Sequence, residues 1–317
     1  GTLGLALLGT ASLWRSYRTT VRLYTGHYTG GKARPVPAAP PNVKPAAPPG
    51  KAAGHLLERE LPWVSEQAAV VALAGLRSLL RAPEAKMLLL TPVILVVVFG
   101  SILFINKIEP PPELRPLMAY GAMSAVLFCM AQLVGNQFGF DRSGFRVFVL
   151  SPAPRREVLL GKNLAVAPLV LVLGVTALVL LEVVYPMPAA SFLACLPQLV
   201  SMYLVFCLLA NCLSVLAPLR IQPGTMKPIN YKVGPILFHM AFLFLCPLAL
   251  APTLLPLGVE SLLEQLHWGT GGVVYLALSL AVCAGVVYLY RTALTWQGDL
   301  LQAREQKILE VVTTREE

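Results

Sequence analysis

The sequence contains little charge and none of the short motifs that mark common enzymes. Only 13% of its 317 residues are charged, about half the share found in soluble globular domains, so an ordinary water-soluble enzyme is excluded. No GxxxxGK[ST] phosphate loop, HExxH zinc motif or GxSxG nucleophile motif occurs. The six cysteines lie inside apolar runs without a CxxC pair and resemble small apolar residues more than a disulfide framework or metal site. We therefore expect no catalytic residue, metal or cofactor in this chain.

Long apolar runs dominate what is present, since 56% of the residues are hydrophobic. Six of these runs are long enough to cross about 30 Å of hydrocarbon as helices. The sequence therefore predicts an all-α membrane protein with a six-span helical bundle. The spans are predicted at 87–105, 116–136, 163–183, 191–216, 235–256 and 271–291.

Basic residues are distributed unevenly among the segments that connect these runs. Of the 25 lysines and arginines, all but Lys107 and Arg115 fall in segments on one side of the predicted topology. Such a bias places that side in the cytoplasm. We expect a multi-pass protein of the cell (inner or cytoplasmic) membrane with both ends cytoplasmic. The net charge of +9 is then explained by topology and anionic lipid, without nucleic acid.

Three different compositions precede the first span. Residues 1–23 are interpreted as the end of an upstream transmembrane helix and its cytoplasmic extension, and 24–54 as a Pro/Ala-rich linker. Residues 55–86 contain an amphipathic helix, from Leu61 to Ala82, predicted to lie in the membrane interface as an elbow. The alternative is an ordinary helix packed on protein. The six-span domain occupies 87–291.

Two later segments are also assigned from their composition. Residues 253–270 are too apolar for a solvated loop and too short for a crossing, so we expect an amphipathic or re-entrant helical element there. Trp268 would lie in the interfacial aromatic belt. Residues 292–317 are predicted to form a cytoplasmic C-terminal tail.

The segment 138–163, FGFDRSGFRVFVLSPAPRREVLLGKN, is the most charged and turn-rich connection between two spans. Its five basic residues favour contact with a partner, or alternatively enforce topology and touch lipid phosphates. Ser151 before Pro152 is typical of a helix start. The candidate partner-coupling residues are Phe140, Asp141, Arg142, Phe145, Arg146, Ser151, Pro152, Arg155 and Arg156.

Several polar residues lie within or beside the predicted spans. They are interpreted as interhelical hydrogen-bond partners, and alternatively as residues lining a translocation pathway. His239 has the further alternatives of a proton relay and of a packed side chain. The candidate pathway residues are Gln132, Asn136, Gln198, Asn211 and His239.

The order of these elements resembles the permease subunit of type-2 ATP-binding-cassette (ABC) exporters over about 61–300. FGFDRSGFR (138–146) and LSPAPRREVLLGKN (150–163) carry the resemblance. It implies that this loop forms a coupling helix docked on a separate ABC ATPase subunit, which would bind and hydrolyse ATP. The family unit has six spans, so the upstream helix implies a second six-span unit, in the same chain or as a homodimer. The chain would then be the C-terminal half of a longer permease. Alternatives are an ion-coupled secondary transporter and a membrane scaffold that anchors a soluble complex.

Overall fold

The computed structural model describes residues 64–106, 110–222, 233–268 and 271–313, together with Thr10, Trp14 and Tyr17. The chain divides into two units, Gly1–Ala52 and Ala53–Glu317, and every element below belongs to the second. The predicted upstream helix (1–23) and linker (24–54) lie outside the described residues, apart from Thr10, Trp14 and Tyr17, which are helical.

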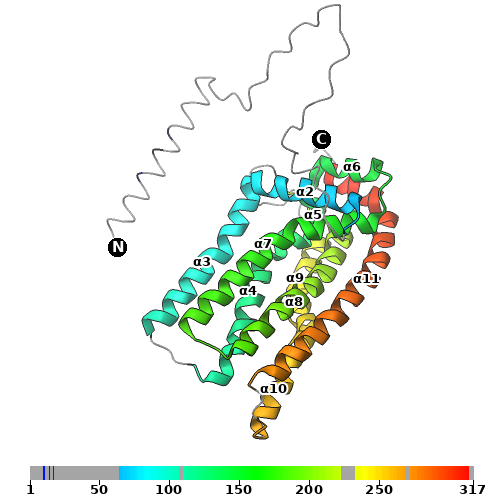
Figure 1. Ribbon diagram of the computed structural model, residues 1–317. Helices are drawn as coiled ribbons and strands as arrows, with labels where there is room; N and C mark the ends of the chain where they lie inside the picture. Colours follow the sequence, from blue (N-terminus) through cyan, green and yellow to red (C-terminus); the bar gives the residue numbers. More distant parts are fainter. Residues whose placement is uncertain are drawn as a thin grey trace, which may run out of the picture. The chain divides into compact units, whose positions relative to one another are not determined.

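The described ranges form helices and no β-strand (Figure 1). The long helices are α3 (Pro83–Asn106), α4 (Arg115–Gly135), α7 (Arg155–Val184), α8 (Ala189–Leu216), α9 (Val233–Leu250) and α11 (Val273–Thr313). The shorter elements are α2 (Glu66–Arg81), the 3-10 turns η2 (Pro112–Leu114), η3 (Arg142–Gly144) and η4 (Ala251–Leu254), and the helices α5 (Gln137–Asp141), α6 (Phe145–Leu150) and α10 (Leu255–Gln265). We call the end of the bundle that carries α5 and α6 the α6 end, and the opposite end the α10 end.

Five helical segments of the described residues are long and apolar enough to cross a membrane, and the bent pair of α2 and α3 makes a sixth if it counts as one span. Every predicted span overlaps one of these helices. The prediction of an all-α membrane protein is therefore confirmed, with five or six spans. Helix α11 continues without interruption to Thr313, so most of the segment predicted as a C-terminal tail is helical.

Helix α2 packs on α7 through small residues. Ser65 caps it by accepting a hydrogen bond from the Ala68 amide at 3.3 Å. A Cβ atom added to Gly161 of α7 would lie 2.6 Å from the Cβ of Val71 and 2.7 Å from the carbonyl oxygen of Ala68. The two helices therefore approach as closely as they do because position 161 is glycine.

The same helix also lies across the direction of the span that follows it. Its axis makes an angle of 75° with the segment Lys86–Ile102, and Figure 1 shows α2 crossing the α6 end. Val70 and Leu80 are exposed on the face away from α7. Helix α2 thus packs on the protein, and it also lies across the following span, as an interfacial elbow would. Its place in the membrane interface stays a prediction.

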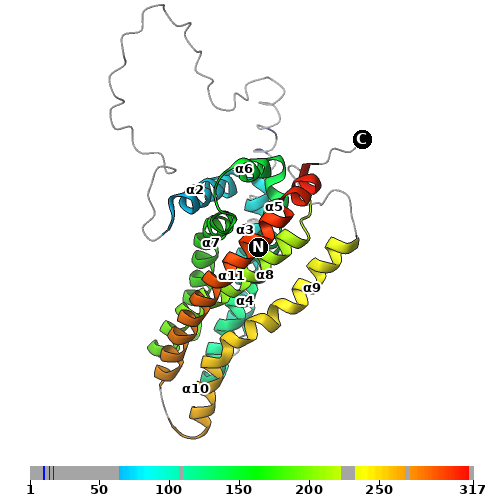
Figure 2. The same ribbon diagram turned by 90° about the vertical axis from the view of Figure 1, so that its right-hand side faces the viewer.

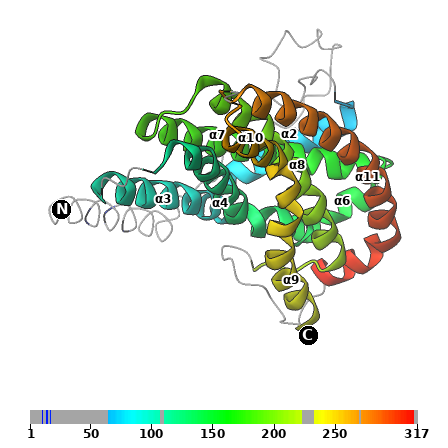
Figure 3. The same cartoon turned by 90° about the horizontal axis from the view of Figure 1, so that it is seen from below.

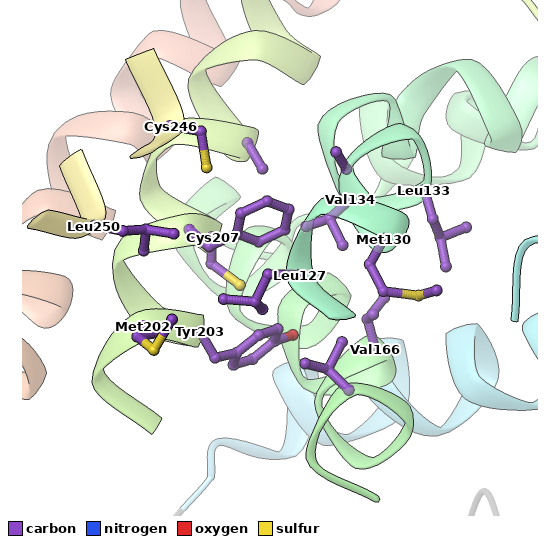
Figure 4. Close-up of a cluster of buried hydrophobic side chains, with 14 of the residues drawn as sticks. Leu127, Met130, Leu133, Val134, Val166, Met202, Tyr203, Cys207, Cys246 and Leu250 are labelled. Carbon is purple, nitrogen blue, oxygen red and sulfur yellow. The ribbon is translucent and has the colours of Figure 1, made fainter. Parts of the chain in front are cut away.

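Helix α8 forms the centre of the bundle. In its most apolar stretch 61% of the residues are buried, against 17% in the segment Val233–Gln265. Figure 4 shows Met202, Tyr203 and Cys207 of α8 among side chains of the neighbouring helices. The labelled neighbours come from α4 (Leu127, Met130, Leu133 and Val134), α7 (Val166) and α9 (Cys246 and Leu250).

Helices α3 and α9 lie at the edge of the bundle. In Figures 2 and 3 the N-terminal half of α9 stands apart from the other helices, and Figure 3 shows α3 at another edge, on the left. Exposed apolar side chains cover α9, among them Leu237, Phe238, Phe244 and Leu248. Such surfaces suit contact with lipid chains, in agreement with a multi-pass membrane protein.

At the α10 end, Glu260 of α10 holds the start of α11. Its carboxylate accepts hydrogen bonds from the amides of Gly272 at 2.6 Å and Tyr275 at 3.0 Å. A carboxylate here satisfies amides in the first turn that have no partner within the helix, and it opposes the helix dipole. Gly272 has φ +85° and would place a Cβ 2.3 Å from Ser191 Oγ, so only glycine fits. The prediction of a helical element within 253–270 is confirmed.

Candidate functional site

The loop 136–154 at the α6 end is bound to the segment that follows α8. The side chain of Asn136 donates to the carbonyl oxygen of Leu219 at 2.7 Å and accepts from the amide of Leu219 at 2.8 Å. A Cβ atom on Gly139 would lie 2.0 Å from that carbonyl oxygen. The first glycine of FGFDRSG therefore allows the two segments to meet.

Arg142 strengthens the same contact from an unusual backbone conformation. Its φ is +52°, which costs a non-glycine residue about 1–3 kcal/mol. Its guanidinium donates to the carbonyl oxygens of Ile221 at 3.0 Å and Gln222 at 3.4 Å. These bonds fix the conformation and give Arg142 an internal structural role.

Asp141 and Lys162 form an ion pair beneath the loop. The Lys162 ammonium also lies 5.1 Å from the ring centre of Phe148, within reach of a cation–π interaction. Burial raises the pKa of Asp141 above its ordinary value, and Lys162 opposes that rise. Next to this pair, Phe145 is buried between Phe138 and Phe148, with ring centres 5.1 Å and 6.3 Å away. Phe145 is thus a core residue of the loop.

Arg155 connects the loop to the far end of α11. Its Nε donates to Glu305 at 2.8 Å, and Nη1 donates to the carbonyl oxygens of Phe148 at 2.7 Å and Ser151 at 3.1 Å. Nη1 and Nη2 also reach the carbonyl oxygens of Ala153 and Val149. Only 12% of the Arg155 side chain is exposed. The guanidinium thus binds four backbone carbonyl oxygens at the end of α6 and in the turn after it. These hydrogen bonds fix the conformation of the loop.

The prediction that a helix starts at Ser151 is wrong. Helix α7 begins at Arg155 with Pro154 as its cap residue, and Ser151 accepts a hydrogen bond from the amide of Ala153 at 3.2 Å. The reason is Pro154, which disfavours the helical conformation of the residue before it. The segment 151–154 is consequently a turn between α6 and α7.

A different set of residues points away from the protein. We call it the exposed loop surface; it consists of Arg146, Val147, Leu150, Pro152 and Arg156. Val147 is 66% and Leu150 84% exposed, and 57% of the Arg156 side chain is exposed. On α6, the exposed residues 146, 147 and 150 lie on one side and the buried Phe145 on the other. The surface therefore combines two apolar side chains with two arginines.

Buried polar residues join this end of the bundle across four helices. Gln137 donates to Asn163 Oδ1 at 3.1 Å, and Asn163 donates to the Tyr290 hydroxyl at 2.8 Å. Tyr203 donates to the backbone carbonyl oxygen of Asn163 at 2.6 Å. Asn163 thereby links α5, α7, α8 and α11.

Two candidate pathway residues, Asn211 and Gln198, also form hydrogen bonds to neighbouring elements. Asn211 donates to Gln297 Oε1 at 2.9 Å, and Gln198 donates to the carbonyl oxygen of Thr253 at 2.8 Å. Gln198 also accepts a hydrogen bond from the Tyr275 hydroxyl. For both residues the interpretation as interhelical hydrogen-bond partners is confirmed.

The other three pathway candidates line one cavity. Gln132, Asn136 and His239 border a space of about 260 Å³ between α4, α9 and the segment after α8. The remaining walls are apolar, with Leu213, Ile236 and Phe242 among them. His239 Nδ1 donates to the carbonyl oxygen of Pro235 at 2.9 Å, and Nε2 has no partner among the described residues. The cavity thus offers hydrogen-bonding groups on an apolar wall.

The structure therefore separates the predicted residues into two groups. Asp141, Arg142, Phe145, Ser151 and Arg155 bind within the protein, and the half-buried Phe140 packs against its core. Arg146, Pro152 and Arg156 face outward. The sequence interpretation missed Asn163, Tyr290, Gln297 and Glu305. Tyr290 and Gln297 are seven residues apart on α11, a spacing that places them on one helix face and could have identified them.

Among the described residues, no group of three or more His, Cys, Asp and Glu side chains could hold a metal ion. Comparison of the chain with family models, curated proteins and solved structures finds no match.

Proposed function

We propose that the chain is the membrane permease subunit of a type-2 ABC exporter, driven by an ATPase on a separate polypeptide. The observation that carries the proposal is the exposed loop surface on an internally fixed loop. Its resemblance to the coupling loop of that family, over 138–163, supports the same reading. The α6 end would then face the cytoplasm, in agreement with the positions of the basic residues.

The composition of this surface suits a protein partner. Val147 and Leu150 expose apolar area next to Arg146 and Arg156. Apolar side chains surrounded by polar or charged ones are typical of protein interfaces. Because Arg155, Asn136 and Arg142 already hold the loop through hydrogen bonds, little conformational entropy would be lost on docking.

The cavity between α4 and α9 supports transport in the same proposal. It lies beside α9, a span with many exposed apolar side chains. Gln132 and His239 would bind a polar group of the substrate while the apolar wall binds the rest. An amphipathic substrate fits this arrangement. A second six-span unit would complete the transporter, as the family resemblance implies.

The docking part is tested by reversing charge on the exposed loop surface. Arg146→Glu together with Arg156→Glu should reduce co-purification of the ATPase subunit more than tenfold and lower its membrane-stimulated ATP hydrolysis. Leu150→Asp should have the same direction of effect. The matched control is Arg81→Glu with Arg291→Glu, two exposed arginines outside this surface, which should leave co-purification unchanged.

The results also separate the alternatives. Undiminished co-purification of the Arg146 and Arg156 variant would refute docking through this surface. If no ATPase accompanies the wild-type protein, the exporter proposal fails. A partner that binds without responding to nucleotide would then indicate a scaffold. Transport abolished by an ionophore, and unaffected by vanadate, would indicate an ion-coupled carrier.

A further inference from the structure

A further cavity lies at the α6 end, next to the segment after α8 that Asn136 binds. Its volume is about 650 Å³, within the roughly 300–1,000 Å³ of small-molecule sites. It is formed by the end of α8 and the residues after it, the first turns of α9 and the last turns of α11. Figures 2 and 3 show the start of α9 and the end of α11 on the same side of the bundle. We call it the α9–α11 groove.

The walls of the groove are both cationic and apolar. Arg220, Arg304 and Lys307 line it, with Glu310 as the one acidic side chain of the lining. The three cations come from two separate segments, so they surround the space from different sides. Phe238 and Ile308 contribute apolar surface. A ligand that complements these walls carries negative charge at one end and hydrocarbon at the other.

The position of the groove along the bundle matches the ends of the spans predicted for α8 and α9. Its apolar lining includes Leu216, the last residue of α8, and Phe238, in the second turn of α9. The predicted spans end at 216 and begin at 235, so the groove lies where these helices leave the hydrocarbon. Basic pockets between spans at the cytoplasmic side bind acidic lipid head groups.

We infer that the α9–α11 groove binds an anionic phospholipid, with the phosphate near Arg304, Lys307 and Arg220 and an acyl chain along Phe238. The apolar wall distinguishes this ligand from a free phosphate or a nucleotide, which would leave that wall exposed to water. The inference requires only that the helices span a membrane, and it does not depend on the proposed exporter function.

The test uses the full-length protein in nanodiscs of phosphatidylcholine, with or without phosphatidylglycerol. After detergent extraction, native mass spectrometry counts the phosphatidylglycerol that stays bound. Wild-type protein should retain this lipid in preference to phosphatidylcholine. Arg304→Gln with Lys307→Gln should weaken retention roughly twenty-fivefold, since each cation near an acidic lipid contributes about fivefold. Arg304→Lys with Lys307→Arg should restore it.

The control removes the same number of charges elsewhere, by Arg81→Gln with Arg291→Gln, and should retain the lipid. Lys307→Glu is a single change at an exposed position and carries little risk to folding. This variant should also lose the bound phosphatidylglycerol. Equal retention by groove and control variants would overturn the inference, as would an equal loss in both. Displacement of the lipid by inorganic phosphate would assign the groove to a free anion instead.

Discussion

Arg155 and Glu305 stand 150 positions apart in the chain, and their side chains meet at 2.8 Å. The contact joins the first turn of α7 to the part of α11 beyond the predicted last span. It is one of the links between the loop 136–154 and the C-terminal helix. Loss of this ion pair should therefore destabilise both the loop and the C-terminal part of α11.

Glu305→Gln should lower the free energy of unfolding by about 1–3 kcal/mol, because the Arg155 charge stays largely buried without its carboxylate. Thermal unfolding of the purified protein measures this effect. Asp299→Asn, an exposed change on the same helix, should alter stability by no more than about 0.5 kcal/mol. Equal effects of the two variants would mean that the ion pair contributes nothing.

Gly161→Ala should separate α2 from α7, because the added methyl group meets Val71 and the carbonyl oxygen of Ala68. Overpacking of this kind costs about 1–3 kcal/mol. Gly285→Ala, where nothing lies within 4 Å, should instead stabilise α11 by up to about 1 kcal/mol through its higher helix propensity. Unfolding midpoints and the protease sensitivity of α2 provide the measurements. Similar midpoints for both variants would contradict the close packing.

The topology predicts which positions react with an impermeant thiol reagent applied to intact cells. In a background in which the six native cysteines are replaced, Glu113→Cys and Glu264→Cys should react. Arg156→Cys and Gln306→Cys should react only after permeabilisation, because they lie at the end predicted to be cytoplasmic. Labelling of Arg156→Cys in intact cells would reverse the orientation.

Glu260→Gln should loosen the α10 end. The neutral amide removes the charge that faces the start of α11, a loss of about 0.5–2 kcal/mol. Hydrogen exchange should accelerate in α10 and in the first turn of α11, while the loop 136–154 stays unchanged. Glu264→Gln, an exposed acid on the same helix, is the control. Unchanged exchange in the Glu260 variant would show that the cap is dispensable.

Hydropathy predicted the long helices well, because each apolar run must satisfy its backbone hydrogen bonds within itself in lipid. The polar residues of α8 were also interpreted correctly: Gln198 and Asn211 bond to neighbouring helices. Such side chains have few partners inside a membrane other than each other. The sequence alone was therefore sufficient to predict the long helices and these hydrogen-bonding side chains, because the surroundings of a membrane span are uniformly apolar.

Prediction was weakest at the α6 end, where charged, polar and apolar side chains are mixed. Residues 292–317 contain charged side chains and are predicted as a cytoplasmic C-terminal tail, and their helical structure up to Thr313 did not follow from that composition. However, Leu294, Leu301 and Ile308 recur every seven residues and are all buried, which is the period of a packed helix face. The partners of Arg155 and Asn136 could not be predicted, since neither Glu305 nor Leu219 is near in sequence. Only the folded chain brings them together.

Helix α11 differs from its neighbours in having no proline along its 41 residues, whereas α3, α7, α8 and α9 each contain one inside the helix. At 1.5 Å per residue it is a continuous helix about 60 Å long along its axis, and Figure 1 shows it running from α10 to the α6 end, where its last turns curve. A helix without a proline kink has no hinge that could absorb a displacement along its length. Tilting α11 by about 5° around its middle would move each tip by about 2–3 Å. A displacement of Glu305 would therefore also displace Tyr275, at the α10 end of the same helix.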